Sequence, residues 1–309
     1  MKCLCDKDTD GKDPCSLSLL YKSDVETKKL DSWSAITNEL DQLIKLTQAK
    51  NDDFLFRGQS RCSWGLQTPL ERSFDAIGSI GKPRREIEGG LVRLFKRQFP
   101  QFRMPVPDDG NYLEWVALMR HYGAPTRLLD WTYTFYAAIF FAIEDLESAS
   151  TEFAVWAIST NWLRDAFKKV TLPAFWSLVG TGGSDPNCRQ VDTFKLVFLS
   201  KTRFVINMNS YGQNERQVVQ QATFLCQGDI EGSFEENLLE LNKGEPIKGN
   251  LTKYVITRDK EERKEILRRL HRMNMNRATL FPGLDGFAQS LRNRMLFPQL
   301  LYSDPKWRS

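Results

Sequence analysis

The stretch from His121 to Thr132 concentrates side chains that bind anions and transfer protons. Its sequence, with Met119 and Arg120 before it, is Met-Arg-His-Tyr-Gly-Ala-Pro-Thr-Arg-Leu-Leu-Asp-Trp-Thr, and it contains one of the chain's two histidines. Strongly apolar helical runs lie on either side, so this polar chemistry falls where a core is expected. The pattern predicts one wall of a ligand pocket.

Arg57 is the second candidate, because it lies near the end of the short apolar run Phe54 to Gln59. A strand that ends in Arg-Gly places a guanidinium at the end of the strand, and Gly58 lets backbone or a ligand approach closely. An arginine clasps a phosphate or a carboxylate through two hydrogen bonds. The structural alternative is a buried Arg57 paired with Asp130, and an Asp130 that orients Arg57 or Arg127 is compatible with both.

His121 and Trp131 have two interpretations each. At a helix C-terminus His121 is favoured in its protonated form, in which it binds an anion or shuttles a proton, or it caps carbonyls of its own helix. Trp131 stacks on a nicotinamide or adenine ring, or it fills the core. The predicted binding residues are Arg57, Gly58, Gln59, Tyr122, Thr126, Arg127, Asp130, Trp131 and Gln221.

The elements that position these residues are irregularly mixed. Apolar periodicity predicts helices over residues 33–50, 111–121 and 284–294, and a central buried helix over the apolar run Phe135 to Ile143. About five short strands fall between the helices, which is typical of the α+β class. We therefore expect a single mixed α+β domain over residues 31–309, preceded by a poorly ordered tail over residues 1–30.

The sequence argues against a membrane-spanning, a secreted and a metal-binding protein. The apolar run Phe135 to Ile143 is far short of the roughly 20 residues that span a bilayer. The N-terminus lacks the apolar segment of a signal peptide, so we expect a cytoplasmic protein without a membrane partner. The six cysteines have no zinc-site spacing, and we expect free thiols and no metal.

The basic segment 258–277 holds eight basic and four acidic residues. Interleaved charges of this kind form many pairs along a helix, which favours a solvated surface helix over a nucleic-acid stripe. An RNA or DNA partner is therefore the weakest of the binding hypotheses.

Three blocks together resemble the bacterial FRG-domain family. They are Phe56-Arg57-Gly58-Gln59 with Trp64-Gly65-Leu66, the His121 to Thr132 block with Phe141-Ala142 after it, and Leu280-Phe281-Pro282-Gly283-Leu284-Asp285-Gly286. The resemblance spans about residues 33–295, with the middle block the most specific in its residue order. It implies kinship of fold more than it implies an activity.

A weaker resemblance extends to the arginine-type ADP-ribosyltransferases. In those enzymes an arginine on the first strand holds the diphosphate side of NAD, and a later glutamate assists the departure of nicotinamide. The resemblance implies an ADP-ribosyltransferase-like fold, NAD as a substrate, and Arg57 as the strand arginine. The chain has no Glu-x-Glu or Gln-x-Glu before a late strand, and Glu215 is the nearest carboxylate.

Two functional hypotheses follow. In the first, the protein is an ADP-ribosyltransferase or NAD glycohydrolase in which Arg57, His121 and Glu215 are catalytic. In the second, it is a non-catalytic domain that senses a nucleotide or a protein in a bacterial stress or phage-defence system. The partners left open are a nucleotide or small-molecule ligand, a protein target and an RNA target.

Overall fold

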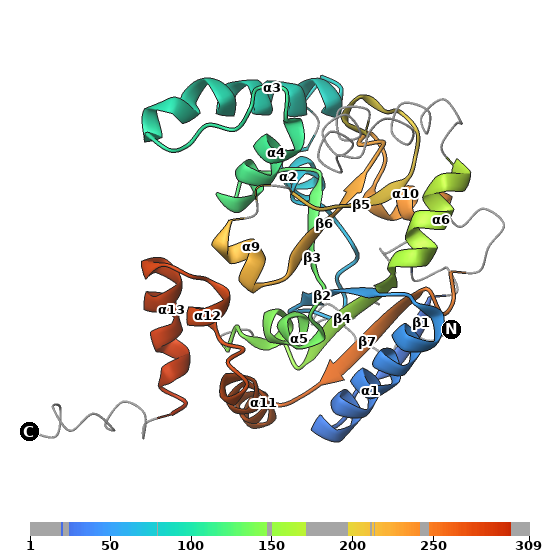
Figure 1. Cartoon of the computed structure of the whole chain (residues 1–309), viewed down its shortest axis with the longest axis vertical. Helices are drawn as coiled ribbons and strands as arrows, with labels where there is room; N and C mark the ends of the chain where they lie inside the picture. Colours follow the sequence, from blue (N-terminus) through green and yellow to red (C-terminus); the bar gives the residue numbers. More distant parts are fainter. Residues whose placement is uncertain are drawn as a thin grey trace, which may run out of the picture.

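The structure is a computed structural model that describes residues 20, 25–78, 80–146, 150–170, 197–210, 212, 214–241 and 247–297. Within these ranges the chain forms one mixed β-sheet of seven strands with helices on both faces (Figure 1). The strands are β1 (Glu26–Lys29), β2 (Phe54–Gln59), β3 (Leu128–Thr132), β4 (Glu152–Ser159), β5 (Val205–Met208), β6 (Ala222–Gln227) and β7 (Leu251–Thr257).

The strand order across the sheet is β1-β7-β4-β2-β3-β6-β5. Strand β1 pairs in parallel with β7, and every other neighbouring pair is antiparallel. Strand β2 pairs with β4 along its whole length, and β3 does the same with β6. In contrast, β2 and β3 meet only at Phe56 and Thr132. The sheet therefore opens between β2 and β3 beyond this single residue pair.

Two apolar cores lie against the two faces of the sheet. One contains side chains of α1 (Trp33–Lys50), α5 (Phe135–Ile143) and α11 (Lys260–Arg272). The other contains side chains of α4 (Tyr112–His121), α6 (Thr160–Val170) and α10 (Phe234–Glu240). The remaining helices are α2 (Pro69–Ile77), α3 (Arg84–Gln98), the 3-10 turn η3 (Phe99–Phe102), α9 (Glu215–Val219), α12 (Arg277–Leu280) and α13 (Leu284–Arg294).

Helix α5 packs on β2 with backbone almost touching backbone. A Cβ atom on Gly58 would lie 1.9 Å from the carbonyl oxygen of Ala138 and 2.8 Å from the amide nitrogen of Ala142. Seven of the nine residues of α5 are buried, so the helix has apolar neighbours on nearly all sides. The glycine next to Arg57 is thus required by the close contact between the strand and the central helix.

The fold confirms the predicted α+β class and the central buried helix. The predicted tail is wrong for residues 26–29, because they form the edge strand β1 between the buried side chains of Val25 and Leu30. Residues 1–19 and 21–24 of that tail lie outside the described residues. Cys226 is a buried free thiol, whereas Cys62 is disulfide-bonded and corrects the expectation of free thiols.

None of the helices in the described ranges is long and apolar enough to cross a membrane.

The contact between Gly58 and α5 gives a test of the fold. Gly58→Ala should lower the free energy of unfolding by about 3 kcal/mol or more, because the methyl group meets backbone atoms that cannot move aside. The control is Gly90→Ala in α3, where the new methyl group would lie 4.0 Å from the end of the Arg93 side chain and a gain of roughly 0.5–1 kcal/mol is expected. Urea unfolding of both variants measures the difference, and equal stabilities would contradict the close approach.

Candidate functional site

A cavity of about 330 Å³ lies where the sheet opens between β2 and β3. Helix α4, helix α9 and the segment after α12 complete its walls. The charged and polar side chains that line it are Arg57, Arg120, His121, Asp130, Thr132, Arg216, Gln217 and Gln220. Its apolar lining includes Phe56, Trp131, Phe141, Phe224 and Phe281.

Arg57 reaches across the opening of the sheet. Its Nη1 donates to the backbone carbonyl oxygen of Asp130 at 2.8 Å, while its buried Nε has no hydrogen-bond partner among the described residues. Burial lowers the pKa of Arg57 to about 10, with the Asp130 carboxylate opposing the shift and Arg72 and Arg120 adding to it. The guanidinium is therefore still charged at neutral pH, and one of its donors is unused.

The Asp130 carboxylate is held by Arg120. Nε and Nη2 of Arg120 donate to Oδ2 of Asp130 at 2.9 and 2.5 Å. Arg57 was predicted to pair with Asp130, and the partner atom is a correction: Arg57 donates to the backbone carbonyl of Asp130, whereas the carboxylate pairs with Arg120. Asp130 itself stays partly open, with 40% of its side chain exposed.

The charge of the Asp130 carboxylate acts on three further arginines, namely Arg57, Arg72 and Arg216. Burial lowers the pKa of both Arg72 and Arg216, and the repulsion from Arg120 adds to each shift. The Asp130 carboxylate opposes the shift in both, as it does for Arg57. Among the described residues that line the cavity, Arg57, Arg120 and Arg216 outnumber the single carboxylate of Asp130, and the cavity favours an anionic ligand.

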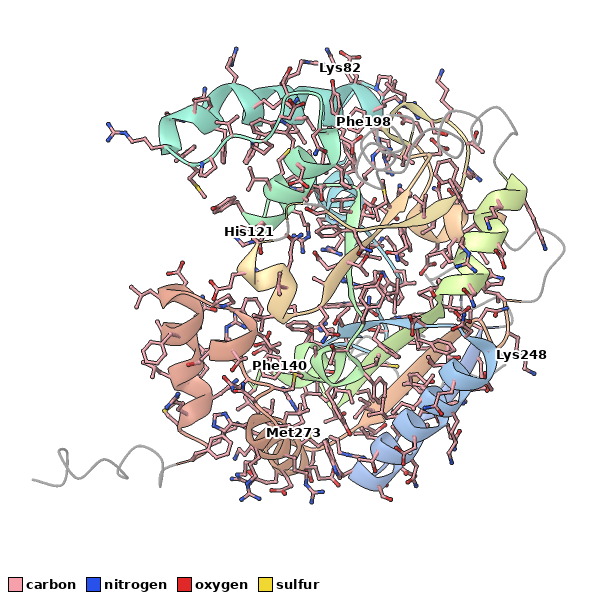
Figure 2. The ribbon with its side chains drawn as sticks, in the orientation of Figure 1. Lys82, His121, Phe140, Phe198, Lys248 and Met273 are labelled. Atoms are coloured by element: carbon pink, nitrogen blue, oxygen red, sulfur yellow. The ribbon has the colours of Figure 1, made fainter. Side chains whose placement is uncertain are left out.

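His121 ends α4 beside α9 (Figure 2). The amide nitrogen of Asn214 lies 3.2 Å from its Nδ1, an arrangement in which Nδ1 accepts and a neutral ring carries its proton on Nε2. Burial lowers the pKa of His121 below its usual value of 6.5, and Arg216 lowers it further. The helix C-terminus favours the protonated ring, whereas burial and the charge of Arg216 act in the opposite direction.

The late motif Leu280 to Gly286 supplies an aromatic wall. The guanidinium groups of Arg216 and Arg277 each lie 4.3 Å from the centre of the Phe281 ring. A Cβ on Gly286 would lie 1.7 Å from the carbonyl oxygen of Phe281, so this glycine lets α13 begin directly against the loop. Gln220 anchors the same segment by donating to the carbonyl of Leu280 at 2.8 Å.

Five of the predicted site residues line the cavity, namely Arg57, Gly58, His121, Asp130 and Trp131. Trp131 is 2% exposed and belongs to the core, yet its buried Nε1 has no hydrogen-bond partner among the described residues. Both interpretations of Trp131 are thus compatible with its position at the cavity wall.

Arg127 is a correction, because it is fully buried away from the cavity. Its Nε donates to Glu88 of α3 at 2.8 Å, its Nη2 makes a further short contact with the same carboxylate, and carbonyls of Val197 and Phe198 accept from the guanidinium. Arg127 is therefore a structural ion-pair residue.

The other predicted residues do not line the cavity either. Gln59 donates to the carbonyl of Gly65 at 2.8 Å and accepts from Nε1 of Trp156 at 2.7 Å, so it is a buried structural residue. Thr126 is buried, and its carbonyl accepts from Leu70. Tyr122 is 53% exposed, and its hydroxyl contacts Met104.

Gln221 and Glu215 are both exposed, Gln221 just after α9 and Glu215 at its first position. Gln221 is exposed and has a positive φ of 46°, and its carbonyl accepts from Tyr133. Glu215 occupies the first turn of α9 with an exposed side chain, outside the cavity lining. The neighbouring Arg216, Gln217 and Gln220 line the cavity in their place.

The comparison with known proteins finds one relationship. Residues 52–151 match the family model of the FRG domain. No curated protein and no solved structure matches the chain. The matched segment includes Arg57, Arg120, His121 and Asp130, whereas Arg216 and Phe281 follow it in the sequence. The cavity is thus completed by residues outside the matched segment.

Within the described ranges, histidine, cysteine and carboxylate side chains form no cluster that could hold a metal ion.

The buried pair of Arg127 and Glu88 gives a second prediction. Glu88→Ala should lower the free energy of unfolding by about 3–5 kcal/mol, because it leaves a desolvated guanidinium without its carboxylate. Glu86→Ala is the control, since Glu86 lies on the same helix in an exposed pair with Lys82, and little change is expected. Urea unfolding compares the two, and a similar loss in both would argue against a structural role for Arg127.

Proposed function

We propose that this FRG domain binds the phosphate groups of a nucleotide in the cavity between β2 and β3, with NAD as the candidate ligand. One observation carries the proposal: three arginines, Arg57, Arg120 and Arg216, line the cavity together with a single described carboxylate, that of Asp130. Like charges this close repel one another, and a phosphate between them relieves that repulsion.

Unused donors support a phosphate over a smaller anion. Arg216 stacks on Phe281 and makes no hydrogen bond or ion pair within the described part of the chain, and Nε of Arg57 is likewise unpartnered there. Planar guanidinium groups bind phosphate oxygens in pairs. A volume of about 330 Å³ is within the range of small-ligand pockets.

The positions of the carboxylates argue for binding of NAD without its cleavage. Loss of nicotinamide passes through an oxocarbenium-like state that normally needs a carboxylate beside it. Asp130 is the one carboxylate among the described lining residues, and two hydrogen bonds from Arg120 hold it, while Glu215 is exposed outside the lining. A non-catalytic nucleotide-binding domain therefore fits this geometry better than an ADP-ribosyltransferase.

Binding to pyrophosphate and NAD at low salt tests the proposal. By isothermal titration calorimetry, Arg57→Ala and Arg216→Ala should each weaken both ligands about ten- to a hundredfold, because each removes a charged hydrogen-bond donor. The control is Arg269→Ala on α11, an exposed arginine paired with Glu265, which should bind like the wild type. Circular dichroism checks that the variants are folded.

No binding of pyrophosphate or NAD by the wild-type protein would overturn the proposal. Equal losses in Arg269→Ala and Arg216→Ala would do the same, since they would show that general charge and not the cavity attracts the anion. Chromatography of the NAD samples adds a separate arm, in which released nicotinamide would favour the transferase hypothesis and make Asp130 the carboxylate to substitute.

The lowered pKa of His121 predicts a pH dependence of anion binding. Because burial and Arg216 lower the pKa of His121, its ring gains a positive charge only at a more acidic pH than an ordinary histidine does. Sulfate, which keeps its charge over this range, should therefore bind more tightly at about pH 5.5 than at about pH 7.5. His121→Asn should flatten this dependence, whereas an unchanged dependence in the variant would exclude His121 from the anion site.

A further inference from the structure

A second pocket, of about 400 Å³, adjoins the arginine cavity along α4. Ala117 and Gln217 line both, so the two spaces share a wall. His121 of the cavity and Asn214 of the second pocket are joined by their 3.2 Å contact at the same boundary. Glu114, Ala117, Leu118 and His121 repeat at helical spacing, and a single face of α4 therefore runs along both spaces.

The chemistry of the second pocket is opposite to that of the arginine cavity. Its described lining contains no lysine or arginine, and it carries two carboxylates, Asp108 and Glu114. Pro105, Pro107 and Leu118 give it an apolar side. A phosphate is disfavoured here, whereas hydroxyl groups and a flat apolar ring are suited to these walls.

Glu114 is fixed in place with one acceptor to spare. Its Oε1 accepts from the amide nitrogen of Gly212 at 2.7 Å and lies 3.3 Å from the hydroxyl of Ser210. Its Oε2 has no hydrogen-bond donor among the described residues. A carboxylate oxygen held this way accepts hydrogen bonds from neighbouring hydroxyl groups, as a pair of ribose hydroxyls would offer.

We infer that the ligand is a nucleotide that spans both spaces, with its phosphates in the arginine cavity and its ribose and base in the second pocket. The inference rests on the proposed phosphate binding and adds the nucleoside side of the ligand. The shared wall sets the order of the groups, because the order of phosphate and then ribose in a nucleotide matches the arginine cavity and the adjoining pocket of Glu114.

The test compares ADP with pyrophosphate, which lacks the nucleoside. In the wild-type protein ADP should bind at least about tenfold more tightly than pyrophosphate. Glu114→Gln keeps the size of the side chain and removes its charge, so it should weaken ADP about tenfold and leave pyrophosphate unchanged. Glu261→Gln on the exposed side of α11 is the matched control, and it should change neither affinity.

Leu118→Trp is a second variant, which fills the pocket and keeps the Glu114 carboxylate. It should also weaken ADP and spare pyrophosphate, because Leu118 lines the second pocket alone. Unchanged ADP affinity in both variants, with pyrophosphate still bound, would overturn the inference and leave the proposed function standing. Loss of pyrophosphate binding in the wild type would instead refute the proposed function itself.

Discussion

The opening of the sheet between β2 and β3 is the constraint on which the site depends. The two strands share one residue pair, and beyond it the Arg57 side chain spans the gap to the carbonyl of Asp130. A side-chain hydrogen bond thus takes the place of a missing ladder bond.

The opening between β2 and β3 also determines which charged side chains lie close together. Strand β3 carries Asp130 into the gap, α4 supplies Arg120, and α9 brings Arg216 from the other side. Burial and mutual repulsion lower the pKa values of Arg57, Arg72 and Arg216 together, so the arginines are held near one another at a cost in free energy. An anion in the cavity lowers that cost, which links the fold directly to ligand binding.

Local patterns predicted the elements and part of the site. The aromatic-Arg-Gly end of β2 and the apolar run of α5 indicated the two segments that meet at the cavity, and Arg57, His121 and Asp130 were found from residue type alone. Arg127 was predicted to line the site and Arg120 was not, because the contact of Arg127 with Glu88 and that of Arg120 with Asp130 cannot be read from the local pattern. Arg216 and Phe281 come from distant segments, which only the tertiary fold brings to Arg57.

A structure of the protein with bound ADP tests the central claim most directly. The account predicts the phosphate groups within hydrogen-bond distance of Arg57, Arg120 or Arg216, with nearby Asp130 excluded from contact with them. Crystals that bind ADP with its phosphates outside the cavity between β2 and β3 would contradict the account, whatever affinity is measured in solution.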